Sequence, residues 1–251
     1  MNLRNNPLTG GLYFLRGFSL ILRPGIRAYV IVPLLVNVFV FAGLIYFGAG
    51  QLRSLVDGML PEWLDWLQWL LLPLFLLAAL LVAFLTFNLL ANLIAAPFNG
   101  LLAEAVERRL TGKEADDGGW QKLLREIRKT LGSELRKLGY IALRAIPLLI
   151  LMLIPGVNVI ASLLWLLFSA WMLAVTYVDY PMGNHGITFP AQRGLLAKRR
   201  MMSLGFGASV MAALAVPVVN FLVIPSAVAG ATAMWVEEFA PGPDASPPAG
   251  A

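Results

Sequence analysis

Charged residues are absent from a long stretch of the chain, between Ala28 and Gly50. A helix over this stretch is long enough to cross the hydrocarbon core of a bilayer, which is roughly 30 Å thick, at about 1.5 Å per residue. Across the whole chain 59% of residues are hydrophobic and 13% are charged, about half the charge content of an ordinary soluble domain. Because a soluble fold needs a largely polar exterior, these features predict an all-α integral membrane protein.

Four apolar segments define the expected architecture. Two of them, at about 28–50 and 67–96, are long enough to be full transmembrane helices. The other two, at about 145–178 and 204–236, contain prolines near their middles. Since two complete passes need about 40 residues, neither of these can cross the bilayer twice. Each is therefore expected to form a re-entrant, partly penetrating hairpin of two short helices.

The polar segments set the expected topology. Residues 98–140 carry apolar residues at spacings of three and four on a charged background, which is typical of an amphipathic helical extension. Residues 12–22 suit an interfacial helix. The positive-inside rule places basic segments on the cytoplasmic side, and these are residues 1–27, 98–140 and 179–203. We expect one membrane domain over 1–238 and a disordered tail over 239–251.

The residue types that are missing or scarce in this chain exclude several kinds of functional site. The chain has no cysteine and a single histidine, His185, which excludes disulfides and multi-histidine metal sites. It also lacks a phosphate-binding loop and a nucleophile elbow. We expect no metal, no cofactor, no enzymatic activity and no nucleic-acid partner. His185 is interpreted as a loop histidine, with titration near neutral pH as the alternative, and Arg144 as a cation that extends to the interface.

The first candidate site is the segment Arg23-Pro24-Gly25-Ile26-Arg27. Proline favours the first position of a helix, so we predict a helix start whose amides at Gly25, Ile26 and Arg27 point outward and bind an anion. The guanidinium groups of Arg23 and Arg27 would flank the same turn. The alternative is a helix start whose arginines contact lipid phosphates.

The second candidate site is a group of polar residues on and after the second span. They are Asn88, Asn92, Asn99, Glu104 and Arg108, with Asn37 of the first span as a further member. On a continuous helix the three asparagines of the second span lie within about 40° of one another, and amides in a span face protein or water. Glu104 and Arg108 are four residues apart and can form an ion pair. The alternative is a set of helix-packing amides and a surface ion pair.

Several short motifs occur in an order that resembles one family of membrane transporters. They are G-L-Y-F-L at 11–15, R-P-G-I-R at 23–27, A-A-P-F-N-G-L-L-A-E-A-V-E at 95–107, V-D-Y-P-M-G-N-H-G at 178–186 and I-P-S-A-V-A-G-A-T at 224–232. Together they resemble the CysZ sulfate transporter family of bacterial inner membranes, within a wider group of EI24-like membrane proteins. The resemblance extends over residues 8–236.

This resemblance implies a fold and a function. Members of the family are multi-pass inner-membrane permeases that take up sulfate for cysteine biosynthesis. They have two long spanning helices and two pairs of partly penetrating helices, and they assemble as homo-oligomers, from dimers up to hexamers, in the lipid bilayer. The alternatives for this chain are a non-transporting membrane scaffold and a channel for a related oxyanion such as sulfite or thiosulfate.

The resemblance also implies roles for individual residues. The sulfate site of the family maps to Gly25, Ile26 and Arg27, and where some members have an arginine pair this chain has Ala28 as the second residue. The translocation path maps to Asn92, Glu104 and Arg108, with Asn37 and Asn88 as further positions. Whether Glu104 relays a proton during uptake is left open.

Overall fold

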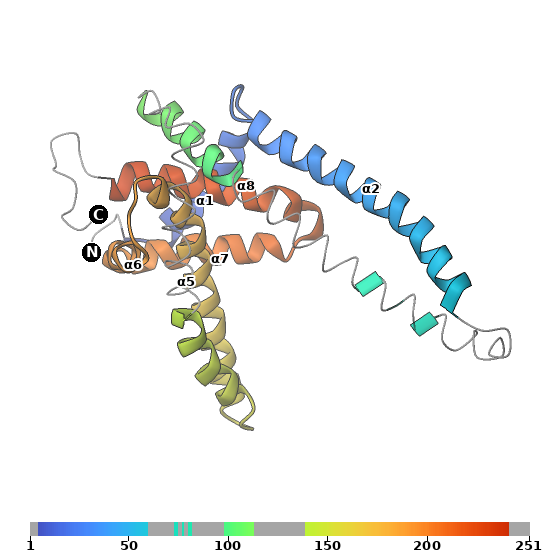
Figure 1. The fold of residues 1–251 in the computed structure, drawn as a ribbon. Coiled ribbons are helices and arrows are strands. Elements are labelled where there is room, and N and C mark those ends of the chain that lie inside the picture. The colour runs from blue at the N-terminus through green and yellow to red at the C-terminus, as the bar shows by residue number, and fades with distance from the viewer. Residues whose placement is uncertain are drawn as a thin grey trace. The chain divides into compact units, whose positions relative to one another are not determined.

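The computed structural model of the chain describes residues 5–59, 98–112 and 139–240, together with 73–74, 77 and 80–81. Within these residues the regular structure is entirely helical (Figure 1), so the predicted all-α class is confirmed. Most of the predicted span 67–96, most of the polar segment 98–140 and nearly all of the tail 239–251 lie outside the described residues. The chain divides into two compact units, Met1–Arg27 with Asn99–Ala251, and Ala28–Phe98, and each is described by itself.

The first unit is a helix bundle. Its labelled elements are α1 (Pro7–Ile21), α5 (Asn158–Asn184), α6 (Phe189–Lys198), α7 (Arg200–Leu214), α8 (Pro217–Met234) and the π-helical turn η2 (Trp235–Phe239). Residues 98–111 and Gly139–Met152 are also helical. α1 packs against both α7 and α8, and α5 packs against α7 (Figure 1). The core of the unit lies where these four helices meet.

The first helix begins at a cap that the local sequence explains. The Asn6 side chain accepts a hydrogen bond from the Leu8 amide at 2.9 Å, and Pro7 occupies the first turn. Both residue types favour a helix start. The side chains of Phe14 and Leu20 on this helix are buried, so the segment expected at the interface has one face inside the core.

Small residues let the helices of the bundle approach one another closely. A Cβ atom on Gly17 of α1 would overlap the Ser226 carbonyl oxygen of α8, and one on Gly207 of α7 would overlap the Ala170 carbonyl oxygen of α5. The second half of α8 is surrounded, because every residue from 226 to 235 is buried. Close contact between small residues stabilises helix pairs in lipid, where the hydrophobic effect contributes little to helix association.

The first predicted hairpin stretch is broken at its Pro155-Gly156 pair. The helix Gly139–Met152 ends before a turn over 153–157, in which Gly156 has a φ of +84° that favours glycine. α5 then continues beyond the predicted end of the stretch at 178, since Pro181 is accommodated inside the helix. α5 is therefore longer than the short helix expected, and the basic segment 179–203 is largely helical.

The second predicted hairpin stretch is broken between α7 and α8. α7 ends at Leu214, and α8 begins at Pro217, whose ring suits the first turn of a helix. A second proline, Pro225, lies inside α8 without ending it. This stretch is therefore two helices joined by a short turn.

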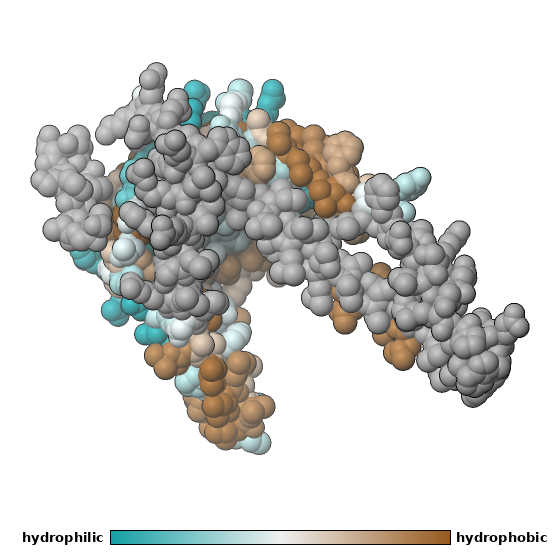
Figure 2. All heavy atoms as spheres, viewed as in Figure 1, coloured by the Kyte–Doolittle hydropathy of each residue, from teal (hydrophilic) through white to brown (hydrophobic). Residues whose placement is uncertain are grey.

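Two of the described helical segments are long and apolar enough to cross a membrane, α5 and Val219–Phe239. The first half of α5 and the preceding helix expose large apolar side chains, which Figure 2 shows gathered at the far end of this hairpin. The second segment is mostly packed inside the bundle. Both segments lie largely within stretches predicted as hairpins, so length and apolarity alone do not separate a membrane span from a core helix here.

The second unit contains α2 (Ala28–Met59), a continuous helix with Pro33 in its interior. It covers the predicted span 28–50 and continues beyond it to Met59. Its apolar side chains are largely exposed, and examples are Ile31, Phe39 and Tyr46. These exposed side chains are the surface that lipid or a second protein would cover.

Candidate functional site

The Arg23–Arg27 segment forms a turn in the structure rather than the first turn of a helix. The amides of Ile26 and Arg27 donate hydrogen bonds to the Arg23 carbonyl oxygen at 3.1 and 3.2 Å. Gly25 has a φ of +88°, which is not helical, and α2 begins only at Ala28. The prediction of outward-pointing amides at Ile26 and Arg27 is therefore wrong, because the turn itself uses these two donors.

Ile26 is the buried residue of this turn. Its side chain is only 2% exposed, whereas Arg23, Gly25 and Arg27 are exposed. The Gly25 amide has no hydrogen-bond partner among the described residues. A buried side chain thus fixes a loop that presents two guanidinium groups and one amide to its surroundings, which is a donor set suited to an oxyanion.

The arginines of this turn differ from two other arginines of the same unit. The Arg16 guanidinium pairs with the Glu237 carboxylate at 2.6 Å, and Arg199 pairs with Glu238. Arg23 and Arg27 form no ion pair within the part of the chain that the structure describes. Their charge is therefore free to attract an external anion.

Sequence reasoning missed the polar cluster that these paired arginines form. The Tyr13 hydroxyl donates to Glu237 Oε2 at 3.0 Å and to Glu238 Oε1 at 3.2 Å. Burial and the two neighbouring carboxylates raise the pKa of Tyr13, so the phenol remains a donor. Charges inside apolar segments could have indicated this cluster. Arg16 lies in one apolar segment with no acidic residue nearby, and Glu237 and Glu238 lie at the end of another with no basic residue nearby.

The helix at 98–111 carries the predicted path residues Asn99, Glu104 and Arg108. Asn99 Nδ2 donates to the Tyr180 hydroxyl at 3.2 Å, so it contacts protein on α5. Glu104 is half-buried and Arg108 is exposed. These two described side chains form no ion pair with each other, which makes the predicted Glu104–Arg108 pair wrong.

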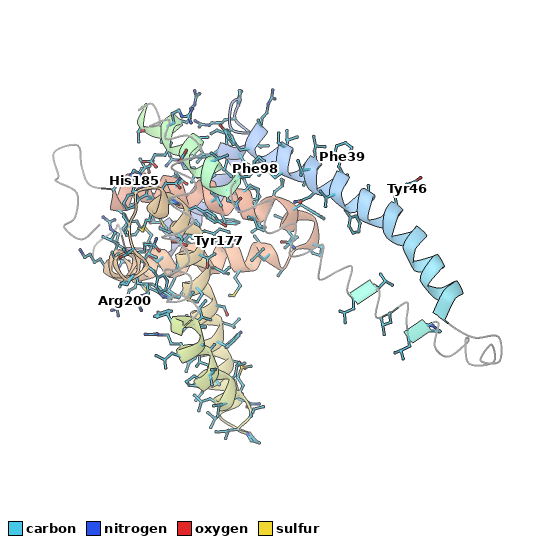
Figure 3. The ribbon with its side chains drawn as sticks, in the orientation of Figure 1. Phe39, Tyr46, Phe98, Tyr177, His185 and Arg200 are labelled. Carbon is cyan, nitrogen blue, oxygen red and sulfur yellow. The ribbon has the colours of Figure 1, made fainter. Side chains whose placement is uncertain are left out.

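Two further contacts hold this helix against the end of α5. Asn184 Nδ2 donates to the Gly100 carbonyl oxygen at 3.1 Å. His185 Nε2 lies 2.8 Å from Glu107 Oε1, and the His185 ring lies 5.5 Å from the Trp235 ring. Figure 3 labels His185 at this junction. His185 is therefore a structural contact between three helical segments, and its loop position agrees with the sequence interpretation.

The remaining predicted residues lie elsewhere. Asn37 is on α2, in the second unit, and its Oδ1 atom is buried with no hydrogen-bond partner among the described residues. Asn88 and Asn92 lie outside the described residues. Arg144 is exposed and stacks over the Tyr140 ring, with its Cζ atom 3.7 Å from the ring centroid, and its extension to the interface stays a prediction. Among the described residues no group of three or more histidine and carboxylate side chains could hold a metal ion.

Comparison with known proteins decides the family. A family model described as Sulfate transporter CysZ/Etoposide-induced protein 2.4 matches residues 13–225. The chain belongs to this family. The protein called sulfate transporter CysZ in Pseudomonas syringae pv. tomato is 47% identical over 235 residues, which are 92% of this chain and 93% of that protein. The resemblance inferred from the motifs is confirmed.

Other relatives agree with this assignment. The protein called sulfate transporter CysZ in Pseudomonas fluorescens is 46% identical, over 92% of this chain and 94% of that protein. The one in Salmonella typhimurium is 44% identical, over 92% of this chain and 93% of that protein. The CysZ family is a family of bacterial membrane transporters, not of enzymes.

Proposed function

We propose that this chain is a sulfate permease of the bacterial inner membrane that supplies sulfate for cysteine biosynthesis. The observation that carries the proposal is the exposed Arg23–Arg27 turn, anchored by Ile26, in a chain that matches proteins called sulfate transporters over 92% of its length. The proposed assembly is a homo-oligomer, from a dimer up to a hexamer, because α2 and the first half of α5 expose extensive apolar surface.

Sulfate capture is proposed at this turn. Sulfate is a dianion at neutral pH, and its transfer from water is costly unless hydrogen-bond donors replace its hydration shell. The Arg23 and Arg27 guanidinium groups and the Gly25 amide provide such donors on one exposed loop. Arg27 is expected to contribute most, because it adjoins the buried Ile26 and is held by the turn's own hydrogen bonds.

The proposed translocation path follows the helix at 98–111 and the polar residues of the two long helices. Arg108 is exposed and unpaired among the described side chains, so it can offset the charge of a passing anion. Glu104 is the carboxylate that would relay a proton if uptake is proton-linked. Asn37, Asn88, Asn92 and Asn99 are proposed as amide donors along this path.

The proposed membrane topology keeps two full spans, at 28–50 and 67–96, and two partly penetrating hairpins. The exposed end of the first hairpin and the buried second half of α8 support a bundle that is only partly surrounded by lipid. The basic character of segments 1–27 and 179–203 supports a cytoplasmic position for these two parts of the bundle.

Labelled sulfate uptake into proteoliposomes that contain the purified chain tests the proposal. We expect Arg27→Ala to weaken sulfate binding about tenfold, the effect of losing one charge-assisted hydrogen bond, and Arg108→Ala to lower flux. Arg200→Ala and Arg109→Ala are the controls, because both remove an exposed cation, and Arg109 lies on the same helix as Arg108. Sulfate uptake that is absent in the parent, or unchanged in both variants, contradicts the proposal. Competition by sulfite and thiosulfate measures selectivity.

A further inference from the structure

Two arginines meet on a single aromatic ring at the base of the exposed hairpin. The Cζ atom of Arg144 lies 3.7 Å from the centroid of the Tyr140 ring, and the Cζ atom of Arg193 lies 4.3 Å from the same centroid. Phe189 packs edge-on against Tyr140, with ring centroids 5.5 Å apart. The helix Gly139–Met152 and α6 therefore place two guanidinium groups against the same aromatic ring.

Among the described residues, the positive charge of this cluster has no counterion. Neither arginine forms an ion pair within residues 5–59, 98–112 and 139–240, in contrast to Arg16 and Arg199. The Arg193 Nε atom is buried and has no hydrogen-bond acceptor. Two neighbouring like charges repel each other, and a buried donor without an acceptor is destabilising. Stacking on the ring offsets part of this cost, and an anion that bridges the two groups would offset the rest.

The surroundings of the cluster favour one kind of anion. Leu143, beside Arg144, is 73% exposed, and the exposed apolar side chains continue through Ile146 and Ile150 toward the turn at 153–157. The charged pair therefore lies at one end of an exposed apolar surface. A free inorganic anion gains nothing from this surface, whereas a phospholipid places its phosphate at such a boundary and its acyl chains along the apolar side.

We propose that Tyr140, Arg144 and Arg193 form a binding site for the phosphate group of an anionic phospholipid. The guanidinium N–H groups donate to the phosphate oxygens, and the acyl chains lie along Leu143, Ile146 and Ile150. Sulfate and inorganic phosphate share the tetrahedral oxyanion chemistry of this headgroup, so the test must separate the lipid from these soluble ions. The site is independent of the sulfate turn at Arg23–Arg27.

Native mass spectrometry of the full chain, purified with phosphatidylglycerol or with phosphatidylcholine, tests this site. We expect the parent to retain phosphatidylglycerol in preference to phosphatidylcholine. Arg144→Gln should weaken phosphatidylglycerol retention about tenfold, and Arg144→Gln with Arg193→Gln should remove the preference. Arg144 is exposed, so the single variant should fold normally. Arg200→Gln, which removes an exposed cation outside the cluster (Figure 3), is the matched control.

Three results would overturn the lipid site. The first is equal retention of the two lipids by the parent. The second is an equal effect of Arg144→Gln and Arg200→Gln. The third is displacement of phosphatidylglycerol by millimolar inorganic phosphate or sulfate, which would show that the cluster binds a soluble anion. The experiment measures lipid retention and not sulfate flux. A result that contradicts the lipid site therefore leaves the proposed transport function untouched, and the reverse also holds.

Discussion

The two halves of α5 occupy different environments. In the second half, Ala170, Ala174 and Val178 are buried against the bundle. In the first half, Ile160, Leu163 and other large side chains of residues 159–167 are mostly exposed. The buried part includes the small residue Ala170 at its contact with α7, whereas the exposed part carries mainly large aliphatic side chains. Small residues mark contact between helices, and large aliphatic residues mark the surface available to lipid.

The largest expected effect comes from adding a methyl group at the small-residue contact of α7 with α5. A Cβ on Gly207 would overlap the Ala170 carbonyl oxygen, so Gly207→Ala should destabilise the fold by about 3 kcal/mol through overpacking. Thermal unfolding in detergent, followed by size-exclusion chromatography, measures this loss. Gly194→Ala on α6 is the control, because nothing lies within 4 Å of the added Cβ. Its stability should equal or slightly exceed that of the parent, and equal melting of both variants would contradict the packing argument.

A smaller effect is expected at the two ion pairs that Glu237 and Glu238 of η2 form with arginines. The Arg199 and Glu238 side chains are 23% and 11% exposed, so Arg199→Gln should cost about 2 kcal/mol by leaving a mostly buried carboxylate without its cation. The Arg16–Glu237 pair is more exposed, at 39% for each side chain, and Arg16→Gln should cost less than about 1 kcal/mol. Chemical denaturation of the two variants checks this order. A reversed order would show that burial does not set the strength of these pairs.

The smallest effect on stability is expected at the exposed half of α5. Leu163 is 58% exposed, so Leu163→Asp should change unfolding in detergent by less than about 0.5 kcal/mol. The same variant should insert less well into liposomes, because a carboxylate in the hydrocarbon region is costly. Flotation of reconstituted protein on a density gradient measures insertion. Val178→Asp at the buried half should destabilise the protein in detergent as well, and an identical response of the two variants would remove the distinction between the halves.

Some features of the fold could be predicted from the local sequence. The helix breaks at Pro155-Gly156 and before Pro217 follow from residues that cannot continue a helix or that favour its start. The motifs that indicated the CysZ family are also local, and the family comparison agrees with them. The helix start predicted at Pro24 is wrong, because Gly25 adopts a positive φ and the helix begins at Ala28, where the predicted span starts.

Contacts between residues far apart in the chain could not be predicted from local sequence patterns. The pairing of Arg16 with Glu237 and the stacking of Arg193 on Tyr140 join helices far apart in the chain. An ion pair or a stacked cation depends on distances that only packing sets, so spacing along one helix suggested a Glu104–Arg108 pair that does not form. Composition and proline positions therefore fixed the membrane class and the helix breaks. Tertiary packing decided which arginines are neutralised and which remain available to an anion.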